Sequence, residues 1–252
     1  MKKSFLLVLM FIGYQFMTSL LLIGVNHLLG RPNPNEFDTG FLILSSILSF
    51  ALVIVSVLVC RDAQLNKASV TSVPLRCYLL CLPLLLSAMF VLNVLSEWAD
   101  LPNLNQEAFL QMAHNPFGVL SIVVMAPLAE ELVFRGAIEG HLLKQGHSAT
   151  FAIVLSSAFF GVVHGNPVQI PFAFMLGMLL AWIYYRTRSV VPGILCHLVN
   201  NGLAVWTMVY IPAEKSTEEL MGGPVALYVA LLLCVVLFVV CFVWARRVFP
   251  RR

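Results

Sequence analysis

The sequence predicts an all-α polytopic membrane protein, a bundle of about eight transmembrane helices. Of its 252 residues, 60% are hydrophobic and only 11% are charged, whereas soluble globular proteins carry roughly 25% charged residues. The mean hydropathy is +0.92, and eight segments are apolar over the length of about 20 residues that a membrane helix needs. This composition excludes a soluble enzyme, a disordered chain and a secreted disulfide scaffold, and a net charge of +3 does not indicate a nucleic-acid-binding protein.

The predicted spans follow one another along the whole chain, so we expect a single integral membrane domain over 1–252. They lie near 4–26, 39–60, 75–97, 116–140, 149–165, 167–186, 189–210 and 224–245. The first three and the last are plain hydrophobic helices, and the segments 1–100 and 224–245 are interpreted as accessory spans. The fourth to seventh contain prolines and glycines, which neighbouring helices can accommodate inside a membrane. No ten-residue alternation of the kind found in membrane barrels is present.

Lysine and arginine residues predict the orientation of the bundle. With the N-terminus in the cytoplasm, twelve of them fall on the cytoplasmic side: Lys2, Lys3, Arg61, Lys67, Arg76, Lys144, Arg186, Arg188, Arg246, Arg247, Arg251 and Arg252. Only Arg31 and Lys215 fall in outer loops. This bias is typical of membrane proteins whose basic loops stay inside, so we expect a multi-pass plasma-membrane protein with both termini cytoplasmic.

Five ionisable residues are predicted to lie well inside spans: Glu130, Glu131, Arg135, His164 and His197. Each charge at the centre of a bilayer costs at least ~2.5–3.5 kcal/mol, so such residues usually mark a functional site. They come from three predicted helices. We therefore expect one polar site between the fourth, fifth and seventh spans.

Helical spacing sorts these side chains. Glu131 and Arg135 are four residues apart and can form an ion pair, for which a structural role is the main expectation. Glu130 lies about 100° around the helix from Glu131, so the two carboxylates are not expected to face the same partner. His197 and Asn201 are again four residues apart and should project together.

This set of residues has two chemical interpretations that the sequence leaves open. A general base with imidazoles in a low-dielectric cavity can activate water. Alternatively, Glu130, His164 and His197 supply the two histidines and one carboxylate of a catalytic zinc site with an open position for water. A divalent metal, zinc in particular, is therefore an expected cofactor. Asn201 suits hydrogen bonding to a developing oxyanion better than metal binding.

The polar residues also fall into three short motifs that resemble those of one family. Glu130, Glu131 and Arg135 match a Glu-Glu-x-x-x-Arg motif, Phe160 and His164 match Phe-x-x-x-His, and His197 and Asn201 match His-x-x-x-Asn. Their order and spacing over about 117–207 are similar to the CPBP family of CAAX proteases and bacteriocin-processing or immunity proteins. The resemblance implies an eight-helix intramembrane metalloendopeptidase of the Ras-converting type with 117–207 as its catalytic core.

In that family the first glutamate and the second-motif histidine are assigned to water activation. The third-motif histidine and asparagine are assigned to stabilising the transition state or to binding metal. Carried over to this sequence, these residues are Glu130, His164, His197 and Asn201, with Glu131 and Arg135 in support. The implied partners are the lipid bilayer and a peptide or protein substrate at the membrane.

Two other functions stay open. The chain could be a non-catalytic immunity or peptide-binding scaffold protein that keeps the polar site, or a proton-coupled transporter, although no repeated halves support the latter. The position of His164 is a further open point. Glu130 and Asn201 fall near mid-membrane, whereas His164 falls near the outer end of its span. Either the fifth helix lies deeper in the membrane than its predicted bounds imply, or the cavity is not a simple cone open to the cytoplasm.

Overall fold

The all-α fold class is confirmed by a computed structural model that describes residues 2–29, 38–63, 73–212 and 214–250. The described residues contain helices and loops but no strand. The helices are α1 (Lys2–Leu28), α2 (Thr39–Val59), α4 (Leu75–Ala99), α5 (Gln106–Ala113), α6 (Pro116–Leu120), η1 (Ser121–Met125), α7 (Ala126–Glu130), η2 (Glu131–Glu139), α8 (Gly140–Lys144), α9 (Ala149–Val162), α10 (Gln169–Thr187), α11 (Val191–Tyr210), α12 (Thr217–Met221) and α13 (Pro224–Val248). The pieces from α6 to α8 form one continuous helix, in which η1 and η2 are π-helical.

Six of the described helices are long and apolar enough to span a membrane: α1, α2, the α6–α8 helix, α4, α10 and α13. The chain is therefore a polytopic membrane protein, although the predicted number of eight spans is not reproduced. α9 has only 14 residues. α11 has 20 residues but is not among the six, because its polar residues His197, Asn200 and Asn201 lower its hydropathy.

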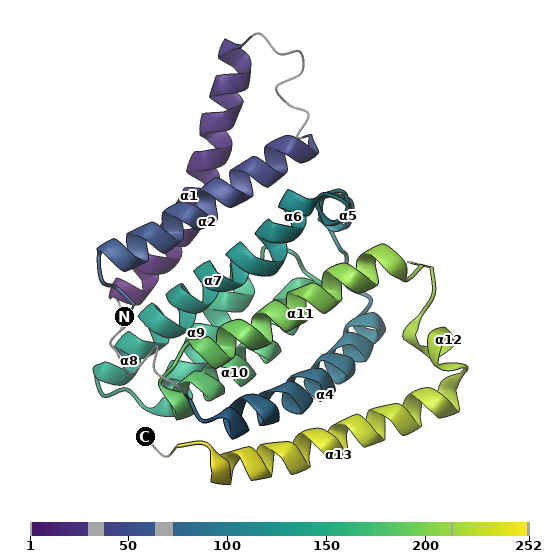
Figure 1. Cartoon of the computed structure of the whole chain (residues 1–252). Coiled ribbons are helices and arrows are strands. Elements are labelled where there is room, and N and C mark those ends of the chain that lie inside the picture. Colours follow the sequence, from purple (N-terminus) through teal and green to yellow (C-terminus); the bar gives the residue numbers. More distant parts are fainter. Residues whose placement is uncertain (1, 30–37, 64–72, 213, 251–252) are drawn as a thin grey trace.

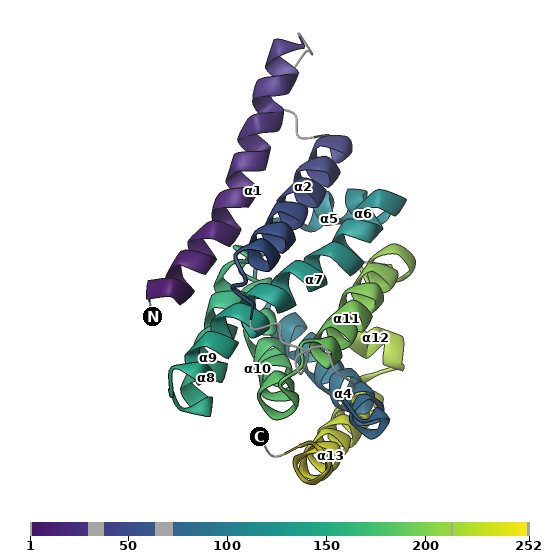
Figure 2. The same ribbon diagram turned by 60° about the vertical axis from the view of Figure 1, so that its left-hand side comes forward.

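The helices pack in pairs around the long central helix. α1 packs against α2, α9 against α10 and α4 against α13. Figures 1 and 2 show the α1–α2 pair on one side of the bundle and α13 on the opposite side, with α7, α11 and α4 between them. α13 buries only Leu227, Cys241 and Ala245, so most of its surface is left to face lipid.

Side-chain caps and turns set where several helices begin. The Asp38 carboxylate accepts a hydrogen bond of 2.6 Å from the amide of Phe41 at the start of α2, and Ser148 caps α9 in the same way. Such caps satisfy amides that have no partner within the helix. α12 begins with a capping box formed by Ser216 and Glu219.

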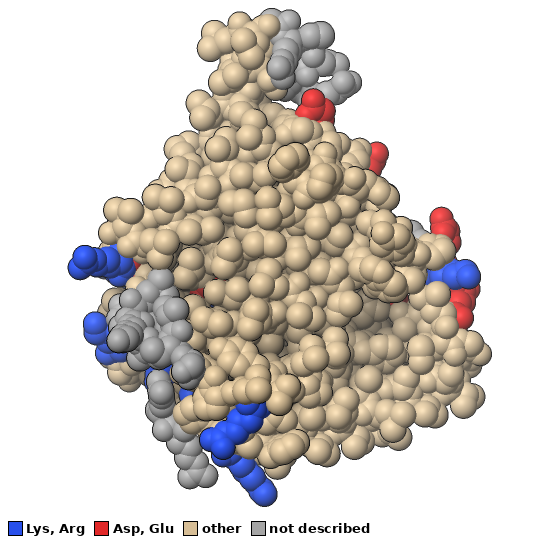
Figure 3. Space-filling model, viewed as in Figure 1, with Lys and Arg blue, Asp and Glu red and all other residues tan. Residues whose placement is uncertain are grey.

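Charges gather at two opposite ends of the bundle (Figure 3). At the end near both termini, Lys3 pairs with Asp62 at 2.7 Å, and the Arg186 guanidinium donates to carbonyl oxygens of Arg246 and Phe249. This end is called the basic end below. The opposite end carries acidic residues such as Asp38 and Glu97, and it is called the acidic end.

Candidate active site

The central helix carries a local break that brings α11 against it. In η1 the amide of Ala126 bonds to the carbonyl of Ser121, five residues back. Continued by one residue, this pattern would pair the Ile122 carbonyl with the amide of Pro127, but proline has no N–H. The side chain of Asn201 in α11 donates to the Ile122 carbonyl instead, at 2.9 Å. Asn201 therefore fixes α11 to the central helix at a position that the sequence itself leaves without a backbone donor.

Glu131 is the centre of the buried polar network. Its Oε1 accepts from the guanidinium of Arg135 at 2.8 Å and from Nδ1 of His197 at 3.0 Å. Glu131 and Arg135 have no exposed surface, so the predicted ion pair is present. A second arm of Arg135 donates to the carbonyl of Gly177 in α10 at 3.2 Å. One carboxylate thus connects the central helix with α11, and its partner Arg135 connects that helix with α10.

His197 lies between the two carboxylates. Its Nδ1 contacts Glu131, and its Nε2 lies 3.5 Å from Oε2 of Glu130. The expectation that Glu130 and Glu131 cannot share a partner is therefore wrong. An imidazole offers two nitrogens on different edges of its ring, so it can reach two carboxylates that point in different directions. The change from α7 to the π-helical η2 also occurs between these two residues.

The Glu131 contact fixes the orientation of the His197 ring. A carboxylate oxygen accepts hydrogen bonds, so Nδ1 of His197 carries the proton that is donated to Glu131. Its Nε2 is then directed at Glu130 and the cavity, with only 3% of the residue exposed. A buried carboxylate behind a histidine also stabilises the ring when it becomes positively charged.

Phe160 is the packing centre of the site. It is almost fully buried, and the Arg135 guanidinium lies over its ring at 4.3 Å from the centroid. The rings of His164 and His197 meet it edge to face at centroid distances of 4.9 and 5.6 Å. The Phe160 carbonyl also bonds to Nδ1 of His164 at 2.7 Å. Because a carbonyl only accepts, Nδ1 donates here and Nε2 of His164 is left for another partner.

The turn after α9 holds His164 in place, and sequence reasoning missed this feature. Gly165 has φ +62, a conformation that costs glycine little and other residues more. The next residue, Asn166, is fully buried. Its amide group donates to the side chain of Asn103, and its oxygen accepts from the amide of Leu104. An asparagine directly after a His-Gly turn was the available signal.

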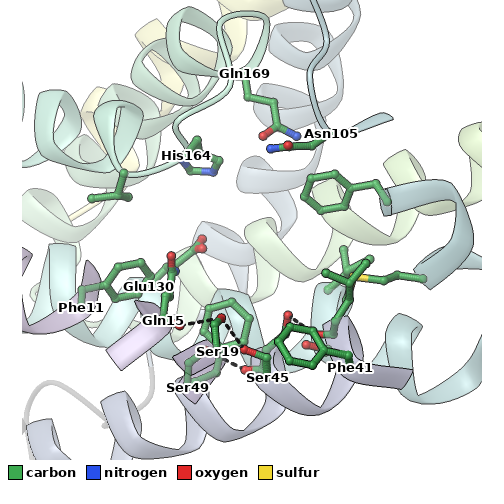
Figure 4. A pocket seen from close by; sticks show the side chains of 18 residues that line it. Phe11, Gln15, Ser19, Phe41, Ser45, Ser49, Asn105, Glu130, His164 and Gln169 are labelled. Atoms are coloured by element: carbon green, nitrogen blue, oxygen red, sulfur yellow. Dashed lines mark hydrogen bonds between the residues drawn. The ribbon is translucent and has the colours of Figure 1, made fainter. Parts of the chain in front are cut away.

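Glu130 and His164 lie on the walls of two adjoining cavities. The first has a volume of about 480 Å³ and lies between the α1–α2 pair and the central helix. The second, of about 220 Å³, also contains His197, Asn200 and Asn201. Figure 4 shows Glu130 and His164 facing each other across the first cavity, with Gln169 and Asn105 beyond His164. Four of the six candidate residues, Glu130, His164, His197 and Asn201, therefore line this space, and Glu131 and Arg135 support it from behind.

Asn200 is a second polar residue of the site that the sequence did not single out. Its side-chain nitrogen donates to the Asn201 oxygen at 2.9 Å, while its own oxygen is buried without a hydrogen-bond partner among the described residues. An unpartnered buried acceptor is costly. In the second cavity it is therefore placed to accept a hydrogen bond from a bound molecule.

Glu139 corrects the expectation that five ionisable residues lie deep in the spans. It ends η2 with no exposed surface, and neither of its carboxylate oxygens has a hydrogen-bond partner in the described part of the chain. The sequence placed it at the edge of a span ending near 140, whereas the helix continues to Lys144. Glu139 does not line either of the two cavities around Glu130.

The residues proposed as zinc ligands line one cavity but do not form a coordination group. Among the described residues, no three His, Cys, Asp or Glu side chains are grouped closely enough to hold a metal ion. His197 uses one nitrogen for Glu131, and His164 uses one for a backbone carbonyl. The zinc site of Glu130, His164 and His197 stays a prediction, and no chemical step below depends on it.

Comparisons with known proteins match the part of the chain that forms this site. Residues 112–203 match a family model described as "Type II CAAX prenyl endopeptidase Rce1-like". The chain is 29% identical over 123 residues to the "Membrane-embedded CAAX protease MroQ" of Staphylococcus aureus (strain USA300), a match that covers 46% of this chain and 50% of that protein. It is 29% identical over 125 residues to the "Putative membrane peptidase YdiL" of Bacillus subtilis (strain 168), covering 47% and 51%.

These matches are partial in both directions. The chain spans about half the length of the curated relatives it matches, and no solved structure matches it. The matched segment begins in α5 and ends in α11, and it contains Glu130, His164, His197, Asn200 and Asn201 of the second cavity. Residues 112–203 of this chain are therefore similar to the Rce1-like type II CAAX prenyl endopeptidases.

Proposed function

We propose that this chain is an intramembrane endopeptidase that hydrolyses a peptide bond of a membrane-associated peptide or protein. One observation carries the proposal. His197 joins the carboxylates of Glu130 and Glu131 at 3.5 and 3.0 Å, and Glu130 faces His164 across a cavity large enough for several water molecules. Membrane proteins rarely bury ionisable groups without a functional reason.

Glu130 is the proposed general base. It is the carboxylate of the site that faces the cavity, with 11% of its side chain exposed, whereas Glu131 is fully enclosed. A water molecule between Glu130 and His164 would donate one proton to the Glu130 carboxylate and a hydrogen bond to Nε2 of His164. The oxygen then attacks the carbonyl carbon of the substrate. Glu130 returns the proton to the leaving nitrogen, so that the peptide bond breaks and the base is restored.

His197 and Asn201 are the proposed partners of the oxyanion. When the His197 ring is protonated, its Nε2–H can donate toward the negative oxygen that forms as water attacks, and Glu131 balances the charge of the ring. Asn201 uses one N–H for the Ile122 carbonyl and keeps a second N–H. Arg135 acts by holding Glu131, and it has no contact with the cavity.

The proposed location is the plasma membrane, with both termini in the cytoplasm. The basic end of the bundle carries the described lysines and arginines near both termini, as Figures 1 and 3 show together. Basic residues next to spans are retained on the cytoplasmic side. This arrangement supports the orientation that the sequence predicts.

The test compares peptides released by membranes that contain the wild-type chain, Glu130→Gln or Glu139→Gln. Both variants exchange a buried carboxyl group of the same helix for an amide, but only Glu130 faces the cavity. We expect a set of peptides that wild type and Glu139→Gln release and Glu130→Gln does not.

Two results would contradict the proposal. Equal peptide release by all three proteins would remove Glu130 from the chemistry. Peptides that co-purify uncut with the wild-type protein, with no released fragments, would instead support the non-catalytic scaffold function.

A further inference from the structure

Three cavities adjoin one another at the candidate active site. The first and second cavities share Glu130, His164 and Gln169 among their lining residues. A third cavity, of about 520 Å³, lies between α4 and α11 and shares Phe172, Asn200 and Ala204 with the second. The candidate site thus lies where these cavities meet the same wall residues.

Both outer cavities lie toward the acidic end of the bundle. The first extends to Phe41 in the first turn of α2 and to Asn105 before α5. The third extends to Glu97 near the end of α4 and to Lys215 and Thr217 beside α12. None of the described basic residues of the basic end lines any of these three cavities.

Toward the basic end, packed side chains around the central helix block access to Glu130. Every residue from Glu131 to Gly140 is buried. Directly behind Glu130, the stacked Arg135 and Phe160 side chains fill the space between the central helix, α9 and α10. Glu139 and Ile138 follow with no exposed surface. A peptide or water molecule cannot reach Glu130 from this end without displacing a packed core.

From this geometry we propose that the active site is reached from the acidic end, which the distribution of basic residues places on the extracytoplasmic face of the membrane. The inference rests on the proposed function for its substrate, a polypeptide segment presented at the outer membrane surface. Access from the acidic end also accounts for the position of His164 near the outer end of its span, because the cavity is then not a cone open to the cytoplasm.

The third cavity fits such a segment in two ways. Its walls include exposed apolar side chains, Leu203, Trp206 and Leu220, which suit a peptide that lies in the membrane interface. At its junction with the second cavity, the Asn200 oxygen is buried and lacks a hydrogen-bond partner among the described residues. A peptide backbone passing this point brings N–H donors that have to be satisfied away from water.

Cysteine labelling tests the direction of access, and the chain supplies its own reference thiol. Cys60 is exposed beside Arg61 at the basic end, while the other five cysteines are buried or half-buried in helices. The test variant combines Ala204→Cys with Cys60→Ser. Ala204 is exposed and lines both the second and third cavities. Right-side-out and inverted vesicles are treated with a charged, membrane-impermeant maleimide, and modification is measured by mass.

We expect the cysteine at 204 to be modified in right-side-out vesicles and Cys60 of the wild-type chain in inverted ones. Modification of both from the same side, or of position 204 from neither side, would overturn the proposed access. If the two thiols are modified from opposite sides but Cys60 reacts in right-side-out vesicles, the acidic end faces the cytoplasm and the extracytoplasmic assignment is overturned. Labelling does not require turnover, so Glu130→Gln in the same background should give the same pattern even if the proposed function is wrong.

Discussion

Removal of Arg135 should destabilise the protein before it affects chemistry. The guanidinium is fully buried, and it makes two charge-assisted hydrogen bonds, to Glu131 at 2.8 Å and to the Gly177 carbonyl at 3.2 Å. It also lies over the Phe160 ring. In Arg135→Ala, Glu131 stays buried without its cationic partner, which typically costs about 3–5 kcal/mol. The lost contact with the Phe160 ring adds roughly 0.5–2 kcal/mol.

This cost is comparable with the total stability of many proteins, roughly 5–15 kcal/mol. We therefore expect Arg135→Ala to accumulate poorly and to melt at a clearly lower temperature in detergent. The double variant Arg135→Ala/Glu131→Gln should recover part of the loss, because a neutral amide costs less to bury than a lone carboxylate and its oxygen can still accept from His197. Melting is followed by the fraction of protein that stays monodisperse after heating.

The result that would refute this reasoning is an Arg135→Ala protein with wild-type thermal stability and no activity. Arg135 would then act in the chemistry itself and not by holding Glu131. A double variant no more stable than the single one would show that the ion pair with Glu131 is not the source of the loss.

Three further changes test other parts of the site. Gly193→Ala should lower stability and activity, because its Cβ would lie 2.8 Å from Oε2 of Glu131. The control is Gly202→Ala on the same helix, whose Cβ would make only an ordinary van der Waals contact at 3.7 Å. Equal stability and activity of the two variants would contradict the close packing at Gly193. Glu139→Gln should leave the melting temperature unchanged or higher, since this buried carboxyl group has no hydrogen bond to lose in the described structure and an amide is easier to bury; a large drop would reveal a partner. If Glu130, His164 and His197 hold zinc, purified wild-type protein should retain about one equivalent of the metal, and His164→Ala should lose it. Near-zero zinc in both proteins, together with full activity of the wild type, would exclude the metal from the mechanism.

The fold class and most of the residues gathered at the candidate site could be predicted from the sequence, because both depend on local composition. Runs of apolar residues locate α1, α2, α4 and α13 to within a few residues, and charges inside such runs are rare enough to single out Glu130, Glu131, Arg135 and His197. Four-residue spacing also predicted the Glu131–Arg135 pair correctly.

Relations between helices could not be predicted in the same way. Regular α-helical spacing separates Glu130 from Glu131, but the π-helical η2 and the two nitrogens of His197 bring both carboxylates to one ring. The burial of Glu139 depends on how far its helix continues. The direction in which the cavities open depends on the packing of helices far apart in the chain, and hydropathy carries no information on that.

The most direct measurement is the rate of peptide cleavage by purified protein in detergent, with a substrate found in the released-peptide comparison. Glu130→Gln should fold and melt like wild type and cleave about 10²–10⁴-fold more slowly, the usual cost of removing a general base. Glu139→Gln should cleave at the wild-type rate. Wild-type cleavage by Glu130→Gln, or equal loss in both variants, would show that Glu130 does not activate the attacking water.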